Sequence, residues 1–97
     1  SGICQLRIDF LDFQLAQPNG DGQCVFDYIA VTGGNSRVPR ICGENTGQHV
    51  YVDFNGDAPI TVTIYTTASY TLGRRYYFRM SQINCDSEFR GAFFSFV

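Results

Sequence analysis

Residues 24–31, with the sequence CVFDYIAV, form the most strand-like stretch of the chain, yet they carry a carboxylate in their middle. We predict a buried strand over this stretch, because apolar and aromatic residues dominate it and a glycine-containing turn follows. Asp27 lies between Phe26 and Tyr28, where an unpaired buried charge would cost several kcal/mol. Its carboxylate is therefore a metal ligand, a catalytic group, a hydrogen-bond acceptor, or a side chain at the open edge of a sheet.

Alternation of apolar and polar residues, typical of half-buried strands, recurs on both sides of this stretch. It predicts strands over 4–10, 48–54, 60–64 and 76–83, and a short edge strand at best over 38–42, which Pro39 interrupts. The apolar phase flips at Leu11, which predicts a bulge or bend there. The turn residues 55–57 (Asn-Gly-Asp) predict a hairpin between 48–54 and 60–64.

These short strands, with no helix-period pattern, predict an all-β fold, an antiparallel sandwich or barrel. A length of 97 residues, 44% of them hydrophobic, suits a single domain over 1–97 with a core over 4–85. The tail 86–97 is rich in Phe. We predict that its last part, 91–97, either packs as a final strand or contacts a partner, which includes a second copy of the chain.

Four cysteines lie at positions 4, 24, 42 and 85, without any C-x-x-C spacing. In a short, strand-rich chain this pattern predicts disulfides and an oxidising compartment. Zinc is the weaker interpretation, because zinc ligands usually come in close pairs and His49 is the only histidine. Spacing alone leaves all three connectivities open.

The charge pattern excludes other classes of function. The net charge is −2, with seven Arg and nine acids, which argues against non-specific nucleic-acid binding. No apolar run approaches the roughly 20 residues of a membrane span.

The chain begins with Ser1 and shows no signal-peptide pattern, so we expect its start to be a processed or truncated point.

Three motifs in this order resemble a CUB domain: CQLRIDFLDFQL (4–15), CVFDYIAV (24–31) and RICG (40–43). The resemblance spans about 4–85, and the segments 42–51 and 82–85 resemble a CUB subtype of secreted arthropod proteins. It implies a disulfide-stapled, jelly-roll β-sandwich that acts outside the cell as a non-catalytic protein-interaction module of larger proteins.

The resemblance also implies a disulfide between Cys24 and Cys42, because the family pairs its second cysteine couple in this way. The family's first cysteine, which normally precedes the equivalent of Cys4, is missing here. We expect Cys4 to pair with Cys85. The alternative is that the partner of Cys4 was lost upstream and that Cys85 bonds elsewhere.

Many CUB domains bind calcium through a Glu and two Asp residues, and only Asp27 retains such a carboxylate here. Ala16 stands at the Glu position, and Thr66 or Thr67 stands at the later Asp position. Asp21 could substitute, so we expect at most a weak calcium site at Asp27 and Asp21, and no other cofactor. Without metal, we expect Asp27 to be a partly buried acceptor for loop N–H groups or a Tyr hydroxyl.

We expect no enzymatic activity. His49 is the sole histidine and opens an alternating strand, and the cysteines are expected to be oxidised. Two of the three carboxylates Asp9, Asp12 and Asp27 could form the pair needed for glycoside hydrolysis, but alternation places Asp9 on a polar outer face.

Loops at the ends of the fold are the expected binding surface for an extracellular protein partner. We single out Tyr70, Arg74 and Arg75 as contact residues, because aromatic and Arg side chains often anchor interfaces. One alternative is a carbohydrate-binding jelly roll, with Tyr70, Tyr76 or Tyr77 stacking on a glycan. Another is a structural or assembly role in a matrix or filament through 91–97.

Overall fold

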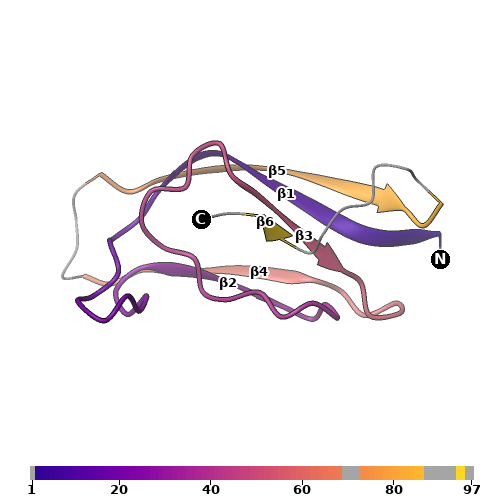
Figure 1. Ribbon diagram of the computed structural model, residues 1–97, viewed down its shortest axis with the longest axis horizontal. Helices are drawn as coiled ribbons and strands as arrows, with labels where there is room; N and C mark the ends of the chain where they lie inside the picture. The colour runs from indigo at the N-terminus through magenta and orange to yellow at the C-terminus, as the bar shows by residue number, and fades with distance from the viewer. Residues whose placement is uncertain (1, 69–72, 87–93, 96–97) are drawn as a thin grey trace.

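A computed structural model describes residues 2–68 and 73–86, together with the backbone of 94–95. All regular elements in these ranges are strands, and none is a helix. The strands form two antiparallel sheets that lie one above the other as two layers (Figure 1). The prediction of an all-β fold is confirmed.

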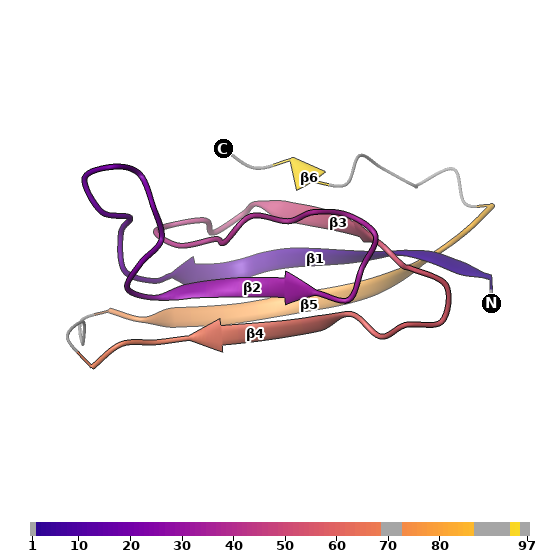
Figure 2. The same cartoon turned by 90° about the horizontal axis from the view of Figure 1, so that it is seen from below.

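The six strands within the described ranges are divided four to two between the layers. They are β1 (Ile3–Gln14), β2 (Tyr28–Thr32), β3 (His49–Asp53), β4 (Thr61–Tyr65), β5 (Arg75–Asn84) and β6 (Phe94–Ser95). Sheet A has the order β5-β1-β3-β6, and sheet B consists of β2 and β4. Figure 2, seen from the side of sheet B, shows β2 and β4 in front of the longer strands β1 and β5.

The long strand β1 is central to sheet A because its apolar alternation continues for twelve residues. It pairs with β3 on one side and with β5 on the other. The pairing with β5 shifts register between Phe10 and Asp12, so that Leu11 is the extra residue. The predicted bulge is confirmed, and it lets both Phe10 and Phe13 point into the core.

The hydrophobic core lies between the layers and draws on both sheets. Its buried members are Leu6, Ile8, Phe10, Phe13, Leu15, Ile29, Val31, Ile41, Val50 and Val52. Phe54, Ile60, Val62, Ile64 and Phe78 pack against them while keeping some exposure. The inward alternation predicted for 48–54 and 60–64 therefore holds.

The strand predicted over 24–31 is wrong in its first half. Residues 24–27 form an irregular segment, and β2 begins at Tyr28. The stretch 38–42 is not a strand either. Only Ile41 pairs there, exchanging backbone hydrogen bonds of 2.9 and 3.2 Å with Ile29.

The predicted hairpin at 55–57 is also wrong. A turn does form, with the Ala58 N–H donating to the Asn55 carbonyl at 3.0 Å. However, β3 belongs to sheet A and β4 belongs to sheet B, so the turn leads from one layer to the other. The two strands do not pair with each other because each pairs with another strand: β3 with β1, and β4 with β2.

Part of the tail forms a strand. β6 pairs with β3 through His49 with Ser95 and Val50 with Phe94. The other residues of 91–97 lie outside the described part of the chain.

Candidate functional site

Two disulfides hold the fold together. Cys4 in β1 bonds to Cys85 just beyond β5, at a sequence separation of 81 residues. Cys24 bonds to Cys42 at a separation of 18 residues. All four cysteines are thus bonded. Cys24 pairs with Cys42 as the family resemblance implies, and Cys4 pairs with Cys85 as expected from the missing first cysteine, so the alternative of an upstream partner for Cys4 is wrong.

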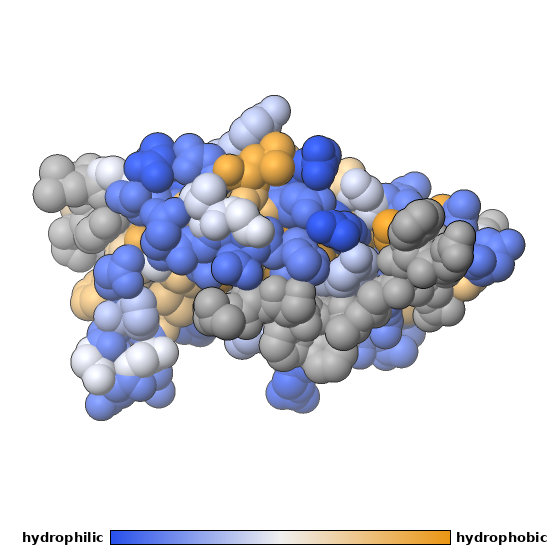
Figure 3. Space-filling model, turned by 45° about the horizontal axis from the view of Figure 1, so that its top comes forward, coloured by the Kyte–Doolittle hydropathy of each residue, from blue (hydrophilic) through white to orange (hydrophobic). Residues whose placement is uncertain are grey.

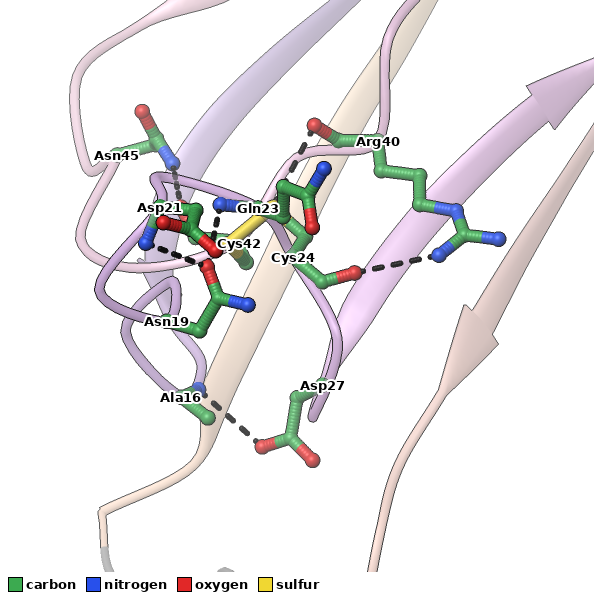
Figure 4. Close-up of a disulfide and its surroundings, with 9 residues drawn as sticks. All are labelled: Ala16, Asn19, Asp21, Gln23, Cys24, Asp27, Arg40, Cys42 and Asn45. Atoms are coloured by element: carbon green, nitrogen blue, oxygen red, sulfur yellow. Dashed lines mark hydrogen bonds between the residues drawn. A yellow bond between two sulfur atoms is a disulfide. The ribbon is translucent and has the colours of Figure 1, made fainter.

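The loop that leads to Cys24 is closed by its own side chains. The Asn19 Oδ1 atom accepts the backbone N–H groups of Asp21 at 3.0 Å and Gln23 at 2.9 Å (Figure 4). Beyond the disulfide, the Asn45 side-chain amide donates to the Cys42 carbonyl at 2.8 Å. The chain on both sides of the Cys24–Cys42 bond is therefore held in a defined conformation.

Asp27 lies at the same end of the molecule, and its side chain is 0% exposed. Its Oδ2 atom accepts the Ala16 N–H at 3.2 Å and the Arg74 Nε–H at 2.9 Å. Its Oδ1 atom accepts the Thr67 N–H at 3.0 Å and the Arg74 Nη2–H at 3.0 Å. Arg74 also donates to the Thr67 carbonyl.

These contacts join three loops around one carboxylate. Ala16 follows β1, Thr67 follows β4, and Arg74 immediately precedes β5. Because both layers contribute a loop, Asp27 fixes the relative positions of the layers at this end. The expectation that Asp27 accepts loop N–H groups is confirmed. However, Asp27 is fully rather than partly buried, and its strongest partner is an arginine, not a tyrosine.

The ionisation of Asp27 follows from these contacts. Burial raises the pKa of the carboxyl, but the hydrogen bonds from Arg74, Thr67 and Ala16, with the charge of Arg74, outweigh burial and lower the pKa below 3.8. Asp27 is therefore a carboxylate at neutral pH. The bidentate Arg74 ion pair provides the compensating charge that its burial requires.

The positions tied to calcium by the family resemblance do meet in space. Ala16, Asp27 and Thr67 come together, but Ala16 and Thr67 contribute backbone N–H groups, which a cation cannot use. Asp21 does not join them: Figure 4 shows it beside Asn19, while the Asp27 carboxylate is directed towards Ala16. Within the described ranges, no three His, Cys, Asp or Glu side chains gather as a metal site would require.

The segment between the disulfide and Asp27 exposes two apolar side chains. Val25 is 47% exposed and Phe26 is 44% exposed, although both were expected inside a buried strand. Their backbone is held between the Cys24–Cys42 bond and the buried Asp27 carboxylate. The sequence does contain a signal for this. Counting back from the inward Ile29 and Val31 in steps of two places Asp27 inside and Phe26 outside, but it also places Val25 inside, so the signal accounts for Phe26 alone.

Aromatic and cationic groups continue this apolar surface. The Tyr28 and Tyr65 rings stack at 4.9 Å on the outer side of sheet B. The Arg40 guanidinium lies 4.3 Å from the Tyr28 ring centre and donates to the Cys24 carbonyl at 3.3 Å. A surface hollow of about 390 Å³ lies between Arg40 and the segment 22–25. We call Val25, Phe26, Tyr28, Arg40 and Tyr65 the loop-end patch.

The predicted partner-binding residues have other surroundings. Arg74 is directed inward to Asp27, and Arg75 is exposed but bonded to Asp12 at 3.1 Å. Arg75 also lies 3.9 Å from Glu44. Tyr70 lies outside the described residues. Sequence reasoning missed the loop-end patch because it assigned Val25 and Phe26 to the core.

The carboxylates considered for glycoside hydrolysis are not brought together. Asp9 is ion-paired with Arg7 at 2.9 Å and lies 3.7 Å from Arg79, on the outer side of sheet A. Asp12 pairs with Arg75, and Asp27 faces inward. Figure 3 shows much of this side of the molecule as hydrophilic, with an apolar island near its upper edge and smaller apolar spots towards the left and the right.

Comparison with known proteins returns no match. No protein-family model, no curated protein and no solved structure matches the chain. Across the described ranges, no helix is long and apolar enough to span a membrane.

Proposed function

We propose that the chain is an extracellular, non-catalytic protein-interaction module with a CUB-like jelly-roll fold. Two disulfides support an oxidising compartment, because such bonds persist mainly in secreted and extracellular proteins. The CUB interpretation is supported by the ordered motifs in the sequence. It is also supported by the meeting of Ala16, Asp27 and Thr67 in space.

The loop-end patch is the observation that carries the binding function. Its exposed Phe, its tyrosine stack and its Arg are of the residue types enriched at protein interfaces. The disulfide and the Asp27 network hold this segment in place before any partner arrives. Little conformational entropy would then be lost on binding, which favours affinity.

We further propose that Arg74 replaces calcium as the positive charge beside Asp27. A guanidinium offers two parallel N–H donors that fit a carboxylate, and it holds the loops by covalent connection to β5. The binding end would then be organised at any calcium concentration.

A screen of purified secreted and cell-surface ectodomains against the immobilised full chain tests the binding function. For an ectodomain that binds, Phe26→Ser should weaken the affinity by about 10-fold or more, the range of a hot-spot residue. Val25→Ser should weaken it by less, because its side chain is smaller.

Leu11→Ser is the matched control, since Leu11 is exposed to a similar degree but lies on β1 in the other sheet. Equal weakening by Leu11→Ser and Phe26→Ser would contradict the proposed surface. A glycan array is run in parallel. Glycan binding lost on mutation of Tyr76 or Tyr77, without any ectodomain binding, would replace this proposal with the carbohydrate-binding alternative.

A further inference from the structure

β5 is an edge strand that lacks two of the usual protections against pairing, a proline and a bulge of its own. Its charged residues, Arg75 and Arg79, form ion pairs with Asp12 and Asp9 of β1. In the order of sheet A the only described neighbour of β5 is β1, and no described strand pairs with its other backbone edge. Its ten residues contain no proline, and the register shifts in its pairing with β1 leave the extra residues in β1. Prolines and bulges in the edge strands of soluble proteins normally prevent association through these edges.

The inward-facing side chains of β5 are also incompletely covered. Phe78 contacts the core, with its ring 5.6 Å from Phe10 and 6.2 Å from Tyr76. Tyr76 and Met80 extend the same row on either side of Phe78, yet they are 51% and 49% exposed. Sheet B ends at β4, so no further described strand covers this row. An occupant of this edge would therefore bury apolar area as well as pair the backbone.

The sequence of β5 is complementary to itself in the antiparallel direction. When two copies are aligned with Phe78 opposite Phe78, Tyr76 faces Met80 and Tyr77 faces Arg79. The first pair is aromatic with thioether, and the second is aromatic with guanidinium, and both are favourable contacts. Shifting the centre by one residue to Arg79 or to Tyr77 places Arg opposite Arg, which is unfavourable.

We infer that two copies of the chain associate through antiparallel pairing of β5 with β5, centred on Phe78. The two four-stranded sheets then join into one continuous sheet, with both copies of sheet B on the same side. The half-exposed Tyr76 and Met80 of each copy lie against those of the other. This contact is separate from the loop-end patch, so the dimer would present two binding ends.

Sedimentation equilibrium of the full chain, from about 1 µM to about 1 mM, tests the inference. The wild type should show a monomer–dimer equilibrium. Tyr77→Glu places Glu opposite Arg79 twice in each dimer and should lower the dimer Kd by about 2- to 30-fold. Tyr77→Lys places Lys opposite Arg79 and should raise the Kd by a similar factor. Tyr77 is 65% exposed, so both variants should fold.

Asp12 lies on β1 opposite Tyr77, and it is opposite Tyr77 in the monomer and in the dimer. It therefore does not change the difference in dimer Kd expected between Tyr77→Glu and Tyr77→Lys. Met80→Lys, which places a charge in the inward-facing row, should abolish the dimer while leaving the circular dichroism spectrum unchanged. A wild type that is monomeric over the whole range would overturn the inference. So would Kd shifts of the same sign for Tyr77→Glu and Tyr77→Lys, or a dimer that persists in Met80→Lys.

Discussion

A buried carboxylate is stable only when its charge and its lone pairs are satisfied, and Asp27 meets both conditions. Arg74 supplies the charge, and two backbone N–H groups from different loops supply further hydrogen bonds. Removing Arg74 would leave the fully buried Asp27 carboxylate without a compensating charge, and removing Asp27 would leave the partly buried Arg74 without its partner. Asp27 and Arg74 therefore act as one structural unit.

Asp27→Asn should lower the free energy of unfolding by about 3 kcal/mol, near the low end for breaking a buried pair, because the Arg74 side chain keeps 26% exposure. The Asn amide can accept through one atom only, and its NH₂ group would face N–H donors. Urea unfolding measures the change. Asp21→Asn, in an exposed loop, is the control and should change stability by less than about 0.5 kcal/mol. Equal effects of the two substitutions would show that the network is not structural.

The pH dependence of stability should carry the signature of the same group. Because the folded-state pKa of Asp27 is lowered below 3.8, its contribution is fully present above about pH 5 and is lost as pH falls through the folded-state pKa. The difference in unfolding free energy between wild type and Asp27→Asn should therefore shrink as the pH falls from 5 to about 3. Urea titrations at several pH values measure this difference. A difference that stays constant would mean that Asp27 does not titrate as described.

Part of this site could be read from the sequence and part could not. The spacing of Asp27 from Ile29 and Val31 indicates an inward carboxylate, because strand side chains alternate. Its arginine partner is 47 positions away, in a chain with seven Arg, and no local pattern selects Arg74 among them. Long-range pairing of this kind depends on how the loops meet in three dimensions.

At the scale of elements, the strands were predictable and some of their partners were not. Alternation identified β1, β3, β4 and β5, and the phase flip at Leu11 located the bulge. The turn at 55–57 was predicted to make a hairpin, yet β3 and β4 lie in different sheets. Turn residues show that the chain reverses, but the layer that a strand joins depends on which strand edges are open.

The end of β2 depends on close backbone approach at Gly33. A Cβ atom there would lie 2.0 Å from the Pro59 carbonyl oxygen, just before β4, and the residue has φ of +91°. Gly33→Ala should therefore destabilise the fold by about 3 kcal/mol or more, because it combines backbone strain with a clash against backbone. Thermal and urea unfolding measure the loss.

Gly22→Ala is the matched control. Gly22 also has positive φ, at +79°, but open space surrounds its Cβ position. It should lose only about 1 kcal/mol, the cost of a left-handed conformation for alanine. If both variants lost the same amount, the contact between Gly33 and Pro59 would have no energetic role.

At the scale of the whole molecule, covalent and ionic links act at opposite ends of the strands. The Cys4–Cys85 bond ties the start of β1 to the end of β5. At the other end, the Cys24–Cys42 bond and the Asp27–Arg74 pair organise the loops that carry the loop-end patch. A small two-layer fold with two described strands in sheet B gains rigidity from such links, since its core alone is limited.

We propose that Arg74, not a metal ion, holds together the loops at the end of the molecule that carries the loop-end patch. The most direct test is the thermal unfolding midpoint of the wild-type chain in millimolar calcium and in excess chelator. The two midpoints should agree to within about 1 °C, because a ligand raises the midpoint only if it binds the folded state. A midpoint that is higher in calcium by more than this would contradict the claim and restore Asp27 as a metal ligand.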